Sequence, residues 1–217
     1  MNQTDIAIVG GGLAGVGLAE QLHRQGVDYQ LFEARDRLGG RIESKAYDGA
    51  RFDLGPAWFW HVQPRLTAAC ERFGIDVFEQ FSDGELLFED SGRQVHRGLG
   101  FASLVSASLA QLGRLFGSRA EKPVKTVIRD WATEPDTATD ADQGFGMEHP
   151  STEITGRIQS IWHGQVLFGA SEMAPQFGGY MEGALEQAQR VAQHVLGETA
   201  NLRSTLLAGS PDSPHQP

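Results

Sequence analysis

A glycine-rich segment near the start of the chain has the residue types and spacing that suit a bound diphosphate. Residues 6–15 read Ile-Ala-Ile-Val-Gly-Gly-Gly-Leu-Ala-Gly. Gly10 permits a tight turn after an apolar strand, Gly12 lets the backbone approach the ligand, and Gly15 lets the next helix pack close to the strand. The N–H groups of Leu13 and Ala14 and the positive end of the helix dipole would face the phosphates.

A carboxylate follows where a ribose would need one. Glu33 closes the next apolar run, residues 27–32, and Ala34 and Arg35 come directly after it. A carboxylate at this position accepts hydrogen bonds from both ribose hydroxyls and repels a 2′-phosphate, which favours FAD or NAD over NADP. The alternative is an ordinary strand–turn–helix with a solvated glutamate.

A second glycine turn favours FAD over NAD. Gly39, Gly40 and Arg41 put another backbone loop and a permanent positive charge within reach of the same diphosphate. Alone, these residues would also suit a glycine turn with a surface arginine.

Further glycine-rich segments near the C-terminus complete a pattern that resembles a known family. Residues 168–172 read Phe-Gly-Ala-Ser-Glu, residues 179–184 read Gly-Tyr-Met-Glu-Gly-Ala, and residues 53–58 read Asp-Leu-Gly-Pro-Ala-Trp. Together with the first segments, they resemble the flavin-binding regions of the flavin-containing amine oxidases, the superfamily of monoamine and polyamine oxidases. The resemblance covers roughly residues 4–100 and 110–197.

The resemblance implies roles for individual residues around FAD. Glu172 would lie beside the ribityl and phosphate chain, and the N–H groups at the start of the last helix, near Gly179 and Met181, would meet the flavin pyrimidine carbonyl. The stretch that would run under the flavin ring comprises Gly55, Pro56, Ala57 and Trp58.

The resemblance also supplies candidates for the substrate side. Tyr180 matches one wall of the family's aromatic cage for the amine, although it would also suit a tyrosine that only caps the turn before a helix. Trp58 is a candidate second aromatic surface or, equally, a buried core residue. The family position of the cysteine that binds flavin covalently falls on Asp140, with Ala141 beside it. We therefore expect non-covalent FAD and a cage that lacks one wall.

The predicted fold class is α/β: an FAD-binding, Rossmann-like dinucleotide domain with a β-meander, in which the substrate domain is largely missing. We expect a first strand buried on both faces, a meander over residues 77–97, and an internal deletion near residues 97–103 relative to the family. One domain then spans residues 1–197, with segments 1–100 and 101–197 flanking the deletion. Residues 198–217 are expected to be disordered. Predicted helices cover residues 13–24, 64–73, 103–116 and a stretch from 181 onward.

Composition narrows the class of partner. The 217 residues carry a net charge of −10, which argues against nucleic acid and against anionic membrane surfaces. The single cysteine, Cys70, excludes an intramolecular disulfide and is expected to be buried. The histidines show no metal-ligand spacing, so we expect no metal site. Without a signal peptide or a membrane-spanning run, the expected location is the cytoplasm.

These features predict a flavin-dependent oxidoreductase that oxidises the C–N bond of a small-molecule amine to an imine, with dioxygen as acceptor and peroxide as product. The alternative is a catalytically silent flavin-binding remnant, or a subunit that needs a partner. Because the missing segment would leave apolar surface uncovered, we also expect a homo-oligomer or a partner chain.

Overall fold

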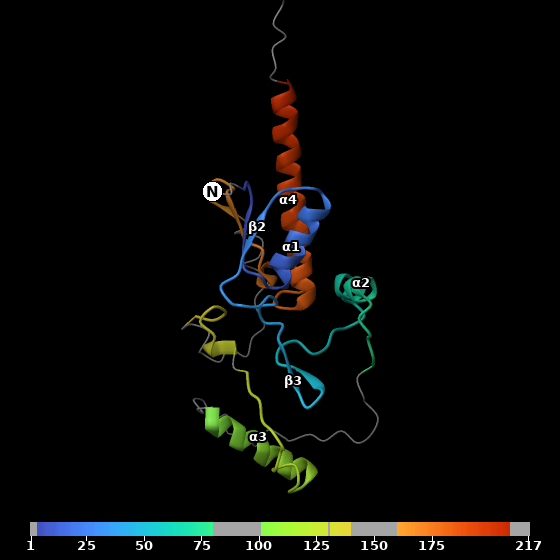
Figure 1. Cartoon of the computed structure of the whole chain (residues 1–217), viewed down its shortest axis with the longest axis vertical. Coiled ribbons are helices and arrows are strands. Elements are labelled where there is room, and N and C mark those ends of the chain that lie inside the picture. The colour runs from blue at the N-terminus through green and yellow to red at the C-terminus, as the bar shows by residue number, and fades with distance from the viewer. Residues whose placement is uncertain (1–3, 80–100, 130, 140–159, 209–217) are drawn as a thin grey trace, which may run out of the picture. The chain divides into compact units, whose positions relative to one another are not determined.

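The computed structural model describes residues 4–79, 101–129, 131–139 and 160–208 (Figure 1). They form two compact units. The first unit contains the glycine-rich segments and draws on residues up to 75, residues 135–137 and the C-terminal part from 160 onward. The second unit contains α3 (Phe101–Phe116) and the short 3-10 helix η1 (Trp131–Thr133). The predicted helix over residues 103–116 is therefore confirmed.

The first unit begins with a strand, a helix and a second strand, as predicted. Strand β1 (Ala7–Val9) pairs in parallel with β2 (Gln30–Phe32), and α1 (Leu13–Arg24) connects them. Gly26 ends the helix in the left-handed conformation with φ of 67°. The Val27 N–H then donates to the Leu22 carbonyl at 3.1 Å, which satisfies a carbonyl at the helix end.

The core of this unit forms between α1 and the last helix, α4 (Met181–Ala208), which lie side by side (Figure 1). Ile8, Ala19 and Leu22 are buried, and Val195 and Leu196 of α4 pack against them. Gly17 keeps the two helices close, because a Cβ placed there would lie 3.1 Å from the Ala188 Cβ. The strands, α1 and α4 thus share one apolar core.

The expectation that β1 is buried on both faces is wrong within the described residues. Ile8 points into the core, but its neighbour Val9 is 87% exposed, and its partner across the strands, Phe32, is 52% exposed. Side chains alternate between the faces of a strand, and the described helices cover only the Ile8 face. Parallel strands normally have both faces covered, so this sheet retains apolar surface on its second face.

Two hairpins and a short helix connect these elements. Strands β3 (Ser44–Tyr47) and β4 (Ala50–Asp53) pair antiparallel across Asp48 and Gly49, whose φ values are both positive, at 48° and 78°. This is the geometry that Asp-Gly favours in tight hairpins. Strands β5 (Ser160–Ile161) and β6 (Val166–Leu167) form the second hairpin, and the 3-10 helix η3 (Ser171–Met173) follows.

Helix α2 (Pro64–Phe73) lies where it was predicted. Proline occupies its first turn, and Gly74, with φ of 61°, ends it. Cys70 is buried on this helix, as expected. No helix among the described residues is long and apolar enough to cross a membrane.

Helix α4 is longer than predicted. It continues to Ala208, into the segment for which we expected disorder from residue 198. Residues 198–208 contain no proline or glycine, and most of them are good helix formers (Glu, Ala, Leu and Arg), through which an existing helix propagates at little cost. Residues 77–79, the described start of the predicted meander, do not lie in a strand. The rest of the meander, the proposed deletion up to residue 100, and Asp140 and Ala141 lie outside the described residues.

Candidate flavin site

At the predicted adenosine end, Glu33 lies at the end of β2 against the first glycine turn. Its carboxylate accepts hydrogen bonds from the Gly11 N–H at 2.6 Å and from the Arg35 N–H at 2.9 Å. The N–H groups of Arg35 and Gly11 hold the pKa of Glu33 below its ordinary value. The carboxylate is therefore charged at neutral pH. It lies at the position that we predicted to contact the ribose hydroxyls.

Arg35 is anchored by a segment far away in the sequence. Its guanidinium donates to the Thr137 hydroxyl at 2.8 Å and lies 3.8 Å from the Asp136 carboxylate. The Arg35 side chain is largely buried by these contacts, with 14% exposed. Residues 135–137, which belong to the same unit, thus border the Glu33 region.

Two glycine turns meet at the start of α1. Gly10 has φ of 100°, and a Cβ on Gly15 would overlap the Gly10 carbonyl oxygen, so this turn and the helix fit only without side chains. The Gly39 N–H donates to the Gly11 carbonyl at 2.8 Å, and a Cβ on Gly40 would lie 3.1 Å from the Gly12 Cα. The second glycine turn therefore borders the first, as its expected role requires.

The start of α1 is available to an anion. No side chain caps the helix at Gly12, and its first turn holds no acidic residue. The N–H groups at a helix start that no capping side chain accepts are a binding site for phosphate. Leu13 and Ala14 supply the first of these N–H groups.

An ion pair joins the N-terminal and C-terminal glycine segments. The Arg41 guanidinium lies 2.6 Å from the Glu172 carboxylate and donates to the Ser171 hydroxyl at 2.9 Å. Burial raises the pKa of the Glu172 carboxyl, but the hydrogen bond and charge of Arg41 outweigh it, so the pKa lies below its ordinary value. Two residues predicted separately for the same ligand, 131 positions apart in the chain, are thus in direct contact.

The segment after β4 packs on the second glycine turn. The Leu54 N–H donates to the Glu43 carbonyl at 2.9 Å, and a Cβ on Gly55 would overlap the Arg41 carbonyl oxygen. Pro56 is half-buried and Ala57 is exposed. Trp58 is 63% exposed, so the alternative of a buried core tryptophan is wrong.

At the start of α4, Tyr180 faces a tryptophan that sequence reasoning did not select. Gly179 has φ of 81°, and its N–H donates to the Ser171 carbonyl at 3.2 Å. Tyr180 and Met181 follow, both half-buried. The ring of Trp60 lies edge-on to that of Tyr180, with centroids 5.8 Å apart and planes at 85°. The available signal was the second tryptophan two positions after Trp58.

Sequence reasoning also missed Glu182 as an anchor. Its side chain is fully buried, and its carboxylate accepts from the Leu66 N–H at 2.8 Å, the Arg65 N–H at 3.2 Å and the Arg65 guanidinium at 3.0 Å. A carboxylate that accepts the first N–H groups of a helix acts as its cap. Glu182 therefore fixes the start of α2 against the start of α4.

Comparisons with known proteins match the two parts of the chain that this site joins. The model of the NAD(P)-binding Rossmann-like domain matches residues 8–73, and that of the flavin containing amine oxidoreductases matches residues 97–196. These matches support the flavin-containing amine oxidase superfamily as the family of this chain. The family's cofactor is a flavin, and the turns, the open start of α1 and Glu33 fit FAD.

Two relatives illustrate the similarity to this superfamily. The chain is 35% identical over 92 residues to the protein named probable flavin-containing monoamine oxidase A of Dictyostelium discoideum. This match covers 42% of this chain and 20% of that protein. It is 34% identical over 98 residues to putrescine oxidase of Kocuria rosea, and this match covers 44% of this chain and 20% of that protein. The chain therefore spans about a fifth of the length of these curated relatives.

Among solved structures, the chain is similar to a wild-type putrescine oxidase bound to putrescine. The two are 30% identical, the TM-score is 0.39, and the match covers 51% of this chain and 26% of the other.

Proposed function

We propose that the chain binds FAD without a covalent bond, along the contacts that join its N-terminal and C-terminal segments. The adenosine ribose would lie at Glu33, and the diphosphate would lie between the start of α1 and the Gly39–Arg41 turn. The observation that carries the proposal is the Arg41–Glu172 pair, because it brings together residues of both family matches. The flavin ring would then lie toward residues 55–58 and the start of α4.

We further propose that the activity is oxidation of an amine C–N bond to an imine, with dioxygen as acceptor and peroxide as product. Bound FAD supplies the electron-accepting group of this reaction. The residues of the chain would bind the cofactor, exclude water with Tyr180 and Trp58, and align the amine. The N–H groups of the first turn of α4, from Met181 onward, would stabilise negative charge on the reduced ring, whereas the Gly179 N–H is already bonded to the Ser171 carbonyl.

A second proposal is a flavin-binding subunit without turnover of its own. The first family match ends at residue 73 and the second begins at residue 97, which leaves little chain between them for a substrate domain. The exposed Val9 and Phe32 face supports self-association or a partner chain. In that case a single domain over residues 1–197 would hold FAD for a neighbouring chain.

Flavin spectroscopy tests both proposals. The purified chain should carry a flavin spectrum, and heat or acid should release free FAD into solution. Loss of the oxidised flavin absorbance on anaerobic addition of an amine would support the oxidase. A chain that binds FAD, is reduced by dithionite and is reduced by no amine would support the subunit instead. Recovery of only NAD(P), or flavin that stays on the denatured chain, would contradict the cofactor proposal.

A further inference from the structure

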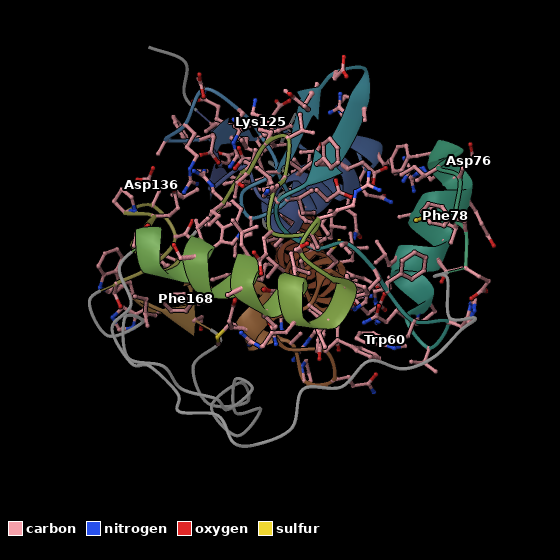
Figure 2. The ribbon with its side chains drawn as sticks, turned by 90° about the horizontal axis from the view of Figure 1, so that it is seen from below. Trp60, Asp76, Phe78, Lys125, Asp136 and Phe168 are labelled. Atoms are coloured by element: carbon pink, nitrogen blue, oxygen red, sulfur yellow. The ribbon has the colours of Figure 1, made fainter. Side chains whose placement is uncertain are left out.

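A buried carboxylate lies at the end of the second glycine turn. Glu43 directly precedes the β3–β4 hairpin, which is drawn in teal in Figure 2, and only 5% of its side chain is exposed. Its carboxylate accepts a hydrogen bond from the Arg37 guanidinium at 3.1 Å and lies 3.1 Å from the Lys45 ammonium. Burying a charged carboxylate costs free energy unless cations and hydrogen-bond donors compensate for the lost water. Arg37 and Lys45 supply this compensation, so the Glu43 carboxylate is anchored.

Arg37 extends this anchor across the turn. Besides its bond to Glu43, the guanidinium donates to the Leu38 carbonyl and to the Ile42 carbonyl, both at 3.4 Å. One side chain at the start of the turn thus contacts the backbone and the carboxylate at its end. The residues predicted for the diphosphate, 39–41, lie between the two ends that Arg37 joins.

The backbone of this turn gains little order from secondary structure. Residues 37–43 belong to no helix or strand, apart from one isolated bridge between Gly39 and Gly12. Gly39 and Gly40 both have positive φ, at 109° and 60°. Glycine loses more conformational freedom on ordering than any other residue, so two in succession make an unrestrained turn costly to order. A turn that is ordered before binding loses less entropy when its ligand arrives.

The same turn determines where the Arg41 guanidinium lies. This guanidinium contacts Ser171 and Glu172, and 47% of the Arg41 side chain is exposed and available to a ligand. Glu43 follows Arg41 by only two positions, so movement of the anchored carboxylate would displace the Arg41 backbone. The Glu43 charge is itself offset by two cations and therefore does not oppose an anionic ligand.

We propose that Glu43, acting through Arg37, is a positioning residue that holds the Gly39–Arg41 turn in place for the FAD diphosphate. The inference rests on the proposed FAD binding and adds a residue that does not touch the cofactor itself. The competing explanation is an ion pair that only stabilises the fold. Positioning predicts weaker FAD binding by variants that are still folded. A purely structural pair predicts a lower free energy of unfolding with unchanged FAD affinity of the folded chain.

Fluorescence titration of the FAD-free chain with FAD tests the proposal, under conditions in which urea denaturation shows each variant to be folded. Glu43→Gln keeps the shape of the side chain but removes its charge, and it should weaken FAD binding about tenfold. Arg37→Lys keeps the charge, but an ammonium cannot reach the carboxylate and both carbonyls together, so the affinity should fall about threefold or more. Because both changes break the same link, the double variant should bind FAD about as weakly as Glu43→Gln alone.

Lys45→Gln is the matched control. Lys45 is the other cation on Glu43, but it is 61% exposed and lies on β3 outside the turn, so its loss should change FAD affinity by less than about twofold. A loss in Lys45→Gln equal to that in Glu43→Gln would show that the local charge matters and the turn does not, which would overturn the proposal.

Other outcomes would contradict the positioning role as clearly. Wild-type FAD affinity in both Glu43→Gln and Arg37→Lys, or additive losses in the double variant, would overturn it. If Glu43→Gln does not fold, the FAD affinity of Arg37→Lys decides by itself. A wild-type chain that binds no FAD would refute the proposed cofactor and this inference with it, whereas FAD binding that the variants leave unchanged would refute the inference alone.

Discussion

Removing the Glu182 carboxylate should destabilise the chain, because two helices meet at this one side chain. In Glu182→Ala, the buried Leu66 N–H and the partly buried Arg65 N–H lose their acceptor, and α2 loses its cap. A buried donor left unsatisfied and a lost helix cap together predict a fall of about 2–4 kcal/mol in the free energy of unfolding. Glu182→Gln keeps an acceptor oxygen but not the charge, so it should lose about 1–2 kcal/mol.

Urea denaturation of the FAD-free protein, followed by far-UV circular dichroism, measures both losses. Glu198→Ala is the control on the same helix, because Glu198 is exposed and its ion pair among the described residues is with the exposed His194. Its free energy of unfolding should change by less than about 0.5 kcal/mol. If Glu182→Ala matched this control, the three hydrogen bonds would not stabilise the α2–α4 junction and the reasoning would be refuted. FAD retention should also fall in Glu182→Ala, since the α2 junction holds the segment that follows residues 55–58.

Three further changes test the site. Gly183→Ala should lower the free energy of unfolding by about 1–3 kcal/mol in the same urea assay, because its Cβ would overlap the Phe177 carbonyl. Lowering the pH below 4.5 should weaken folding as Glu172 is protonated, and Glu172→Gln should flatten this part of the pH–stability curve. Glu33→Ala should weaken FAD binding about tenfold or more, measured by fluorescence titration of the FAD-free protein.

Specific outcomes would contradict each of these. An unchanged unfolding midpoint in Gly183→Ala would show that the helix start has room for a side chain. The direction of the pH effect follows from the lowered pKa: the Arg41 contact stabilises the folded state above 4.5 and is lost as the pH falls through the folded-state pKa. Equal curves for wild type and Glu172→Gln would mean that the ion pair adds nothing. Wild-type FAD affinity in Glu33→Ala would place the ribose elsewhere.

Local signals in the sequence predicted the first part of the fold well. Helix α1 has the predicted bounds, and Gly10, Gly15 and Gly26 stand where backbone geometry requires glycine. The β3–β4 hairpin was missed although Asp48-Gly49 carries its signal. These features depend on neighbours within a few residues, so they can be read from the chain directly.

Contacts between distant segments were not predictable in the same way. The sequence named Arg41 and Glu172 for one ligand, but their mutual ion pair depends on packing between the two ends of the chain. Trp60 could be recognised as part of the site only because the structure shows its ring in contact with that of Tyr180. The exposed face of β1 was mispredicted because apolar residues predict a strand, whereas its covering depends on which other elements reach it.

The packing of α1 against α4 has a consequence for biosynthesis. Leu22 is fully buried, and the partners that cover its core include Val195 and Leu196, in the last described element of the chain. While the chain is being translated, β1, α1 and β2 emerge long before α4 and keep their apolar surfaces open to solvent or chaperones. The ion pair between Arg41 and Glu172 can likewise form only after Glu172 has been synthesised. Assembly of the cofactor site must therefore await the synthesis of α4, so FAD would be captured only after both glycine-rich parts of the site have been made.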